Sequence, residues 1–343
     1  MRLQHKRMSR SENSKKFDFW FMILRIAIVL LIVGLFLAQN NMLTVSEFIY
    51  GNEKLPKSFV GYRIVHISDF KNSTVGTSAK VNKLNPDIIV ITGGLTDNNG
   101  NYKNTVEEVK RLVKIAPVYY ILSVDDHGND VLADTGAVNV TDNIIELSPK
   151  EKELNQFIID NYGKYVINDF NANNEEAIKF VNNAKEALEA TKNSKIYLCG
   201  FPGVNEDGDA IKSEMIAYKL KEKADGGYCI GLIGNLYHLD NINKANIELE
   251  FIGGTFGVNR LSNEIKKGKY GYKGADLFVS SGIGNTKGVT RIFNFPNIQL
   301  VILSDGTMSD ATAFDRFLHK FIPDVGTVYD NDGGIREHTY TGN

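Results

Sequence analysis

Acidic side chains follow three strand-like runs in the first half of the chain. Asp69 comes after YRIVHIS, Asp97 closes GGLTD after DIIVIT, and Asp125 and Asp126 follow PVYYILS, with His127 directly behind them. Carboxylates and imidazole bind Ca²⁺, Mg²⁺ or Zn²⁺, and strand ends are where α/β proteins form sites. One interpretation is therefore a single divalent metal ion held by these five residues. The alternative, which we favour for the cluster around Asp125, is a solvated loop whose acids form turns.

The elements that would position these residues alternate along the chain. Short, β-branched, largely apolar runs are typical of strands covered on both faces. The eight predicted strands are YRIVHIS, DIIVITGG, PVYYILS, SKIYLCG, GYCIGLIG, IELEFIGG, ADLFVSS and NIQLVIL. Amphipathic helices are predicted between them, around 106–113, 177–188 and 209–224. Strands that alternate with helices indicate an α/β protein, in which His66 lies inside a strand as a packed residue.

The ends of the chain differ from this middle part. Residues 1–16 are basic, and residues 17–39 are long and apolar enough for one transmembrane helix, with Trp20 at the interface. The basic flank predicts a single-pass protein of the cell membrane, with tail 1–16 in the cytoplasm and the rest outside. A cleaved signal peptide is the alternative. We expect a polar linker over 40–60 and a polar C-terminal tail over 304–343.

Composition excludes some classes of partner and leaves the cysteines open. A formal net charge of -2 argues against nucleic acid, because phosphate binding requires a basic surface. Cys199 and Cys229 lie in apolar runs without the spacing of a zinc site. We interpret them as two buried thiols, and a disulfide between neighbouring strands is the alternative.

The order of the strand ends resembles the calcineurin-like metallophosphoesterases, especially their membrane-anchored bacterial branch. The runs LNPDIIVITGGLTD, APVYYILS and LFVSSGIGNTKGVTRIFNFPNIQLVIL are similar to that family in pattern and order, over roughly residues 60–303. The resemblance implies a four-layer α/β/β/α sandwich for residues 61–303, and a hydrolase site for phosphoric esters at the strand ends.

The first three family motifs have lost most of their metal-binding residues here. The D-x-H motif keeps Asp69 but has Lys71 in place of the histidine. Gly94 stands where the resemblance implies the metal-bridging aspartate. Val124 and Asp125 replace the asparagine ligand and the catalytic histidine of G-N-H-D/E. Only Asp69 of the implied ligands survives, so we expect Lys71 to pair with it without metal.

The later motifs have lost their histidines as well. The lone histidine position is Asn235, and the two histidines of G-H-x-H-G-G are Gly254 and Phe256. His238 is displaced by three residues from the lone histidine position, and Asp97 is expected to cap the next segment. The glycine-rich run SGIGNTKGV is interpreted as a structural turn, with Lys287 and Arg291 as candidate anion contacts.

These losses predict a protein that recognises rather than cleaves. Two divalent ions need a bridging carboxylate and nitrogen donors, and no activated water forms without a metal. We expect no cofactor and a pseudoenzyme that binds an anionic ligand or a protein partner at the cell envelope. The alternative is a divergent phosphoesterase with one rebuilt metal site, and a third possibility is regulation of an active relative by pairing with it.

Overall fold

The computed structural model describes residues 17, 19–34, 42–73, 76–123, 126, 130–149, 194–202, 210–236, 239–254, 267–284, 291, 294–304, 325–329 and 335–339. Its main body contains two mixed six-stranded sheets, each with four adjacent parallel strands. The expected α/β class is confirmed.

The first sheet has the order β1-β12-β2-β3-β4-β5. Strands β2 to β5 are parallel, whereas β12 is antiparallel to β2 and parallel to the edge strand β1. The strands are β1 Thr44–Gly51, β2 Arg63–Ile67, β3 Ile88–Thr92, β4 Val118–Ile121, β5 Val138–Asn139 and β12 Asn297–Ser304.

The second sheet has the order β10-β11-β9-β8-β7-β6. Strands β11, β9, β8 and β7 are parallel, and the edge strands β10 and β6 are antiparallel to their neighbours. The strands are β6 Ile144–Leu147, β7 Ile196–Phe201, β8 Tyr228–Ile233, β9 Leu249–Ile252, β10 Gly268–Tyr272 and β11 Ala275–Val279.

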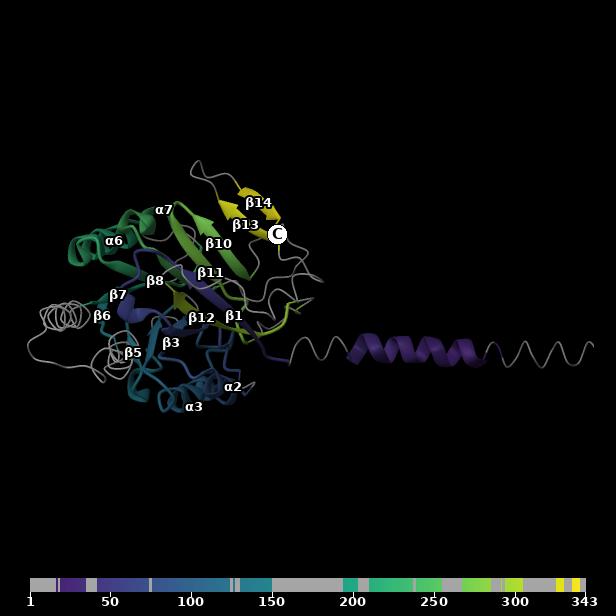
Figure 1. Ribbon diagram of the computed structural model, residues 1–343. Coiled ribbons are helices and arrows are strands. Elements are labelled where there is room, and N and C mark those ends of the chain that lie inside the picture. Colours follow the sequence, from purple (N-terminus) through teal and green to yellow (C-terminus); the bar gives the residue numbers. More distant parts are fainter. Residues whose placement is uncertain are drawn as a thin grey trace, which may run out of the picture.

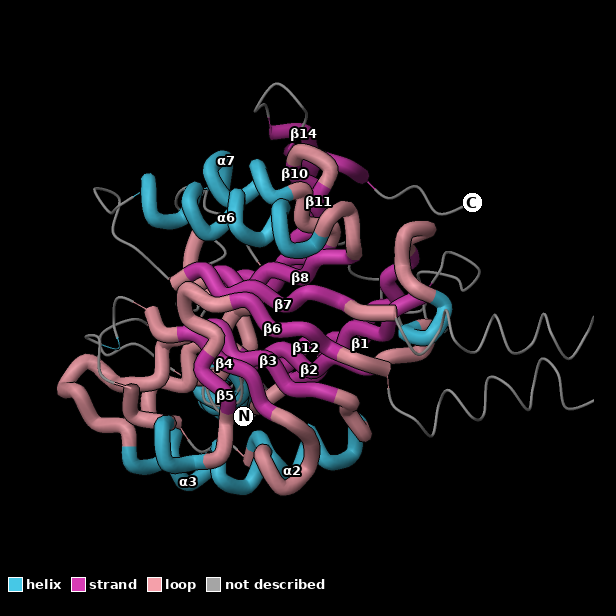
Figure 2. The backbone as a smooth tube through the Cα atoms, turned by 90° about the vertical axis from the view of Figure 1, so that its left-hand side faces the viewer, coloured by secondary structure: helices cyan, strands magenta, loops and turns pink. Residues whose placement is uncertain are grey.

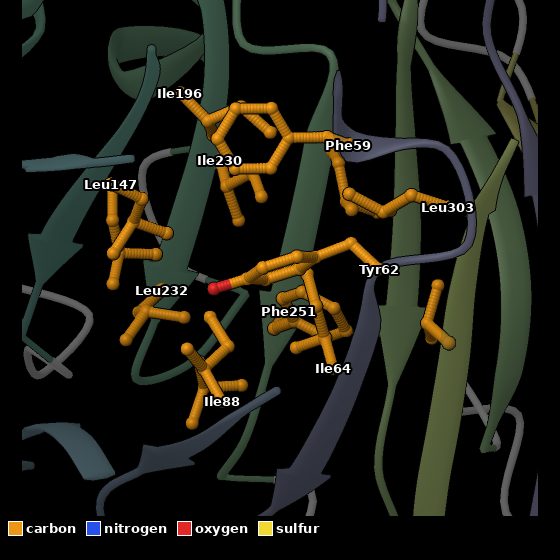
Figure 3. Close-up of a cluster of buried hydrophobic side chains, with 14 of the residues drawn as sticks. Phe59, Tyr62, Ile64, Ile88, Leu147, Ile196, Ile230, Leu232, Phe251 and Leu303 are labelled. Carbon is orange, nitrogen blue, oxygen red and sulfur yellow. The ribbon is translucent and has the colours of Figure 1, made fainter. Parts of the chain in front are cut away.

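The two sheets lie face to face, and helices cover their outer faces (Figures 1 and 2). Helices α2 (Thr77–Leu84) and α3 (Lys103–Leu112) pack on the first sheet, and α6 (Ala210–Ala224) and α7 (Leu239–Ile242) pack on the second. Apolar side chains from both sheets meet in the middle, with Ile64 and Ile88 on one side and Ile230 and Leu232 on the other (Figure 3). Burial on both faces explains why these strands are continuous apolar runs.

The second sheet contains a carboxylate without a partner. Glu250 of β9 is fully buried, and neither of its side-chain oxygens has a hydrogen-bond partner. In the register of the sheet it lies between Gly231 of β8 and Leu277 of β11. A Cβ added to Gly231 would lie 3.5 Å from its Cγ, so the side chain of Glu250 packs beside this glycine. Burial raises the pKa of Glu250 to about 8.

All eight strands predicted from apolar runs are present, and four further strands, β1, β5, β6 and β10, complete the two sheets. The most important is β1, because it lies within the predicted linker 40–60 and pairs with β12 along its whole length. Its sequence TVSEFIYG mixes polar and apolar residues, as suits an edge strand that is only partly buried. The folded region therefore begins before residue 61.

The predictions for both ends of the chain are only partly tested. Residues 19–34 are helical, but within the described part of the chain no helix is long and apolar enough to cross a membrane. The predicted C-terminal tail 304–343 contains two antiparallel strands, β13 (Val325–Tyr329) and β14 (Ile335–Thr339), so it is not without regular structure. The predicted helix around 177–188 lies outside the described residues, and the one around 209–224 is confirmed as α6.

Candidate functional site

Asp69 lies at the point where the carboxyl ends of both sheets meet. Its side chain is only 1% exposed, and its Oδ2 accepts hydrogen bonds from the Ser68 hydroxyl at 3.0 Å and the Gly254 N–H at 3.2 Å. The backbone N–H of Asp69 donates to the Gly93 carbonyl, and its own carbonyl accepts from the Gly284 N–H. Loops that follow β2, β3, β9 and β11 therefore converge on this one residue.

Glycines make this convergence possible. A Cβ at Gly94 would lie 2.6 Å from Oδ1 of Asp69, and one at Gly282 would lie 2.7 Å from its Cβ. A Cβ at Gly284 would lie 2.2 Å from the Phe70 carbonyl oxygen. These distances are shorter than any real contact, so backbone occupies the space on several sides of the carboxylate. Position 94 therefore has no room for a side chain in this arrangement, because its Cβ would also lie 2.7 Å from the Cα of Asp69.

The turn after Asp69 has an unusual backbone. Asp69, Lys71 and Asn72 all have left-handed φ values, of 49°, 48° and 57°. Asp and Asn tolerate this region, whereas Lys71 adopts it at a cost that the surrounding contacts must offset. One such contact is the Lys71 N–H, which donates to the Gly94 carbonyl at 2.8 Å.

Two buried cations stabilise the charged form of Asp69. Burial raises the pKa of Asp69 to about 6, and the charges of Lys71 and Arg291 act in the opposite direction. Lys71 is 7% exposed and its charge lowers the Asp69 pKa, whereas the expected direct pairing of the two side chains stays a prediction. Arg291 is 1% exposed and donates from Nη2 to the carbonyls of Gly282 and Gly284 at 3.2 and 2.5 Å. Its guanidinium holds the loop after β11 in place, and its role as an anion contact stays a prediction.

Asp126, a member of the alternative metal site, is committed to the backbone. It is fully buried and accepts hydrogen bonds from the N–H groups of Gly94, Leu95 and Thr96, at 3.2, 2.6 and 3.2 Å. It also accepts from the N–H and hydroxyl of Ser123, at 2.8 and 3.0 Å. These five hydrogen bonds occupy the lone pairs of both carboxylate oxygens of Asp126. Asp126 therefore fixes the loop after β3, and it is not available as a ligand in this arrangement.

Asp97 has a structural role, as expected, but it binds its own loop and does not cap α3, whose N-cap residue Tyr102 makes no side-chain cap hydrogen bond. Its Oδ1 accepts from the N–H groups of Asn99 and Asn101 at 2.9 and 2.8 Å, and its Oδ2 accepts from the Asn101 side chain at 3.0 Å. This is a local turn motif of the kind that Asp commonly forms. The acid after β3 thus shapes the segment leading to α3.

The remaining predicted positions are only partly described. Gly254 lies close to Asn235, since a Cβ on the glycine would be 3.0 Å from the asparagine Cβ, and both belong to the same group of strand-end loops. Several predicted positions lie outside the described residues, namely Val124, Asp125, His127, His238, Phe256 and Lys287.

His66 and the cysteines have structural environments. His66 is fully buried in β2 between Gln299 and Thr92, with both ring nitrogens 2.8 Å from their side-chain oxygens, and burial lowers its pKa to about 4. This confirms a packed histidine. Cys199 and Cys229 are buried free thiols, so they do not form the disulfide that was the alternative prediction. Burial raises the pKa of both thiols.

The described part of the site does not fit a pair of metal ions. No group of three or more His, Cys, Asp or Glu side chains within it is arranged to hold a metal. Backbone fills space on several sides of Asp69, and the cations whose charges act on its carboxylate are Lys71 and Arg291. A shallow hollow of about 360 Å³ lies at the start of α3, lined by residues 100–103 with Val106 and Glu107.

Comparison with known protein families and with characterised protein sequences gives no match to this chain.

Proposed function

We propose that this protein is a membrane-anchored, extracytoplasmic binding protein with a metallophosphoesterase-like sandwich, and that it does not cleave phosphoric esters. The observation that supports this most directly is the closure around Asp69. A Cβ at position 94 would collide with Asp69 Oδ1 at 2.6 Å, so the bridging carboxylate of a two-metal site has neither a residue nor a space.

The environment of Asp69 supports recognition rather than hydrolysis. A metal ion would normally offset the cost of burying this carboxylate, and here Lys71 and Arg291 supply positive charge instead. An ammonium or guanidinium ion generates no hydroxide for attack on phosphorus. The site residues therefore hold the strand-end loops in a fixed shape that can present a binding surface.

The anchoring part of the proposal rests on the N-terminal region. Residues 1–16 are basic, and the helical residues 19–34 expose large apolar side chains, among them Trp20 at 68% and Leu30 at 65%. The proposed anchor is the whole apolar run 17–39, of which this helix covers 19–34, and an apolar run of that length suits the hydrocarbon core of a bilayer.

The test is metal content and hydrolysis, measured on the purified full chain. We expect no stoichiometric transition metal by elemental analysis, and background hydrolysis of an aryl phosphate diester with manganese present. The Gly94→Asp variant should remain inactive, because it restores a carboxylate without restoring space. Manganese-dependent hydrolysis that is abolished by Asp125→Ala would refute the proposal in favour of the divergent phosphoesterase with a rebuilt site.

A further inference from the structure

The chain joins the first sheet at the same edge that holds Asp69. Thr44, the first residue of β1, pairs with Asn297, and its N–H donates to the Pro296 carbonyl at 2.8 Å. The Asn297 N–H in turn donates to the Gly282 carbonyl at 3.1 Å. Gly282 lies directly against Asp69, since a Cβ on it would be 2.7 Å from that of Asp69. Only a short series of contacts therefore separates the start of β1 from the candidate site.

The chain is held firmly where it meets this edge. Leu43 is buried against the first sheet and its helices, and its carbonyl accepts a hydrogen bond from Lys80 Nζ of α2 at 2.5 Å. Residues 35–41 are all that connects this part of the chain to the helical residues 19–34. Seven residues span at most about 25 Å even when fully extended. An anchor in the N-terminal helix would therefore keep the Asp69 edge close to the bilayer.

The same edge exposes apolar side chains from three separate parts of the chain. Met42 is 54% exposed just before β1, Tyr102 is 46% exposed just before α3, and Ile211 is 70% exposed in the first turn of α6. Helix α6 ends three residues before β8 begins, so its first turn lies at the opposite, carboxyl end of the strands. This placement agrees with the ion pair between Lys212 of α6 and Asp142. The backbone N–H of Asp142 donates to the carbonyl of Gly200, which lies near the carboxyl end of β7.

We propose that this edge rests on the bilayer surface, with Met42, Tyr102 and Ile211 in the headgroup region. The proposal rests on the anchoring proposed above and adds an orientation to it. Isolated aromatic and aliphatic side chains on one edge insert readily at the membrane interface. The hollow beside Tyr102 and Lys103 would then open toward the lipid headgroups. The loops around Asp69 accordingly meet ligands that are at or in the membrane.

The orientation can be measured with a fluorescent probe at each end of the strands. In the full chain, reconstituted into phosphatidylcholine–phosphatidylglycerol vesicles, Asn99→Cys places a label at the Asp69 edge and Glu53→Cys places one at the opposite edge. Both positions are exposed, and the two native cysteines are buried. The five residues of β2 separate the edges by about 17 Å. Nitroxides on lipid headgroups should quench the first label and leave the second unquenched.

Substitutions of the apolar residues test the contact itself. The triple variant Met42→Ser, Tyr102→Ser, Ile211→Ser should lose the quenching at position 99. The control variant Val60→Ser, Val138→Ser removes exposed apolar residues elsewhere and should keep it.

Flotation of the vesicles separates the two proposals. Protein that floats but shows equal quenching at both positions overturns the orientation and leaves the anchoring intact. Floating protein whose quenching survives the triple variant overturns the assigned contact. Protein that does not float refutes the anchoring, and the orientation with it.

Discussion

Replacing Glu250 by methionine should stabilise the protein, and more so at alkaline pH. The carboxylate is fully buried in β9 without a hydrogen-bond partner, and burial raises its pKa from 4.5 to about 8. Folding therefore favours the protonated form. Stability is highest below the unfolded pKa and falls as pH rises from 4.5 through 8. Methionine has a similar length and no charge to bury, so the variant removes this cost.

The two pKa values set the size of the effect. Once Glu250 is fully ionised, its burial costs up to roughly 5 kcal/mol. Between about pH 6.5 and 8.5 the wild-type protein should lose about 2 kcal/mol of unfolding free energy from this group alone. Two other buried groups change charge below that interval. The pKa of Asp69 is raised to about 6, so this group lowers the unfolding free energy as pH rises to 6. The pKa of His66 is lowered to about 4, so this group raises the unfolding free energy as pH rises from 4 to 6.5.

Urea unfolding at several pH values, followed by circular dichroism, measures this directly. The Glu250→Met variant should be the more stable protein at every pH in the interval, and its stability should be nearly constant there. Glu250→Gln is the matched control, because it keeps the shape and removes the titration but leaves a buried amide unpaired, at a cost of about 1–3 kcal/mol. A methionine variant that retains the wild-type slope would show that another group causes it, and the reasoning would fail.

Three further results are expected. Gly94→Ala should destabilise the protein by about 2 kcal/mol or more in urea unfolding, because the added Cβ meets Asp69. Gly100 has a similar positive φ with open space around it, so the control Gly100→Ala should cost only about 1 kcal/mol. Equal effects of the two substitutions would argue against crowding at position 94. Asp126→Ala should cost about 3 kcal/mol or more, because it leaves several buried N–H groups unpaired, and a thermal midpoint like that of the wild type would contradict this. His66 should remain neutral above about pH 5 in NMR titrations. A titration midpoint near pH 6.5 would show that burial does not hold the imidazole in its neutral form.

The sequence was most informative where strands are buried on both faces. Strands β3 and β8 are almost entirely apolar, so they could be predicted as strands without any partner information. Strand β1 could not, because its polar residues resemble a linker and its identity depends on β12, far away in the sequence.

The candidate site was predictable in its residues but not in its arrangement. A site without most metal ligands is what the motif resemblance predicts, and this stays a prediction, whereas the structural role of Asp97 follows from local turn chemistry. The role of Asp126 depends on N–H groups about thirty residues earlier in the chain, which no local pattern indicates. Likewise, the requirement for glycine at 94 and 282 arises from contact with Asp69, which only the folded chain reveals.

The pairing of β1 with β12 determines when the first sheet can be completed. Thr44 and Pro296, which are bonded to each other, lie 252 residues apart. Because β12 sits between β1 and β2, β2 has an uncovered edge until nearly the whole body has been synthesised. Such late, non-local closure slows folding and leaves an edge open to aggregation. A nascent chain would thus remain dependent on chaperones until β12 has emerged and inserted.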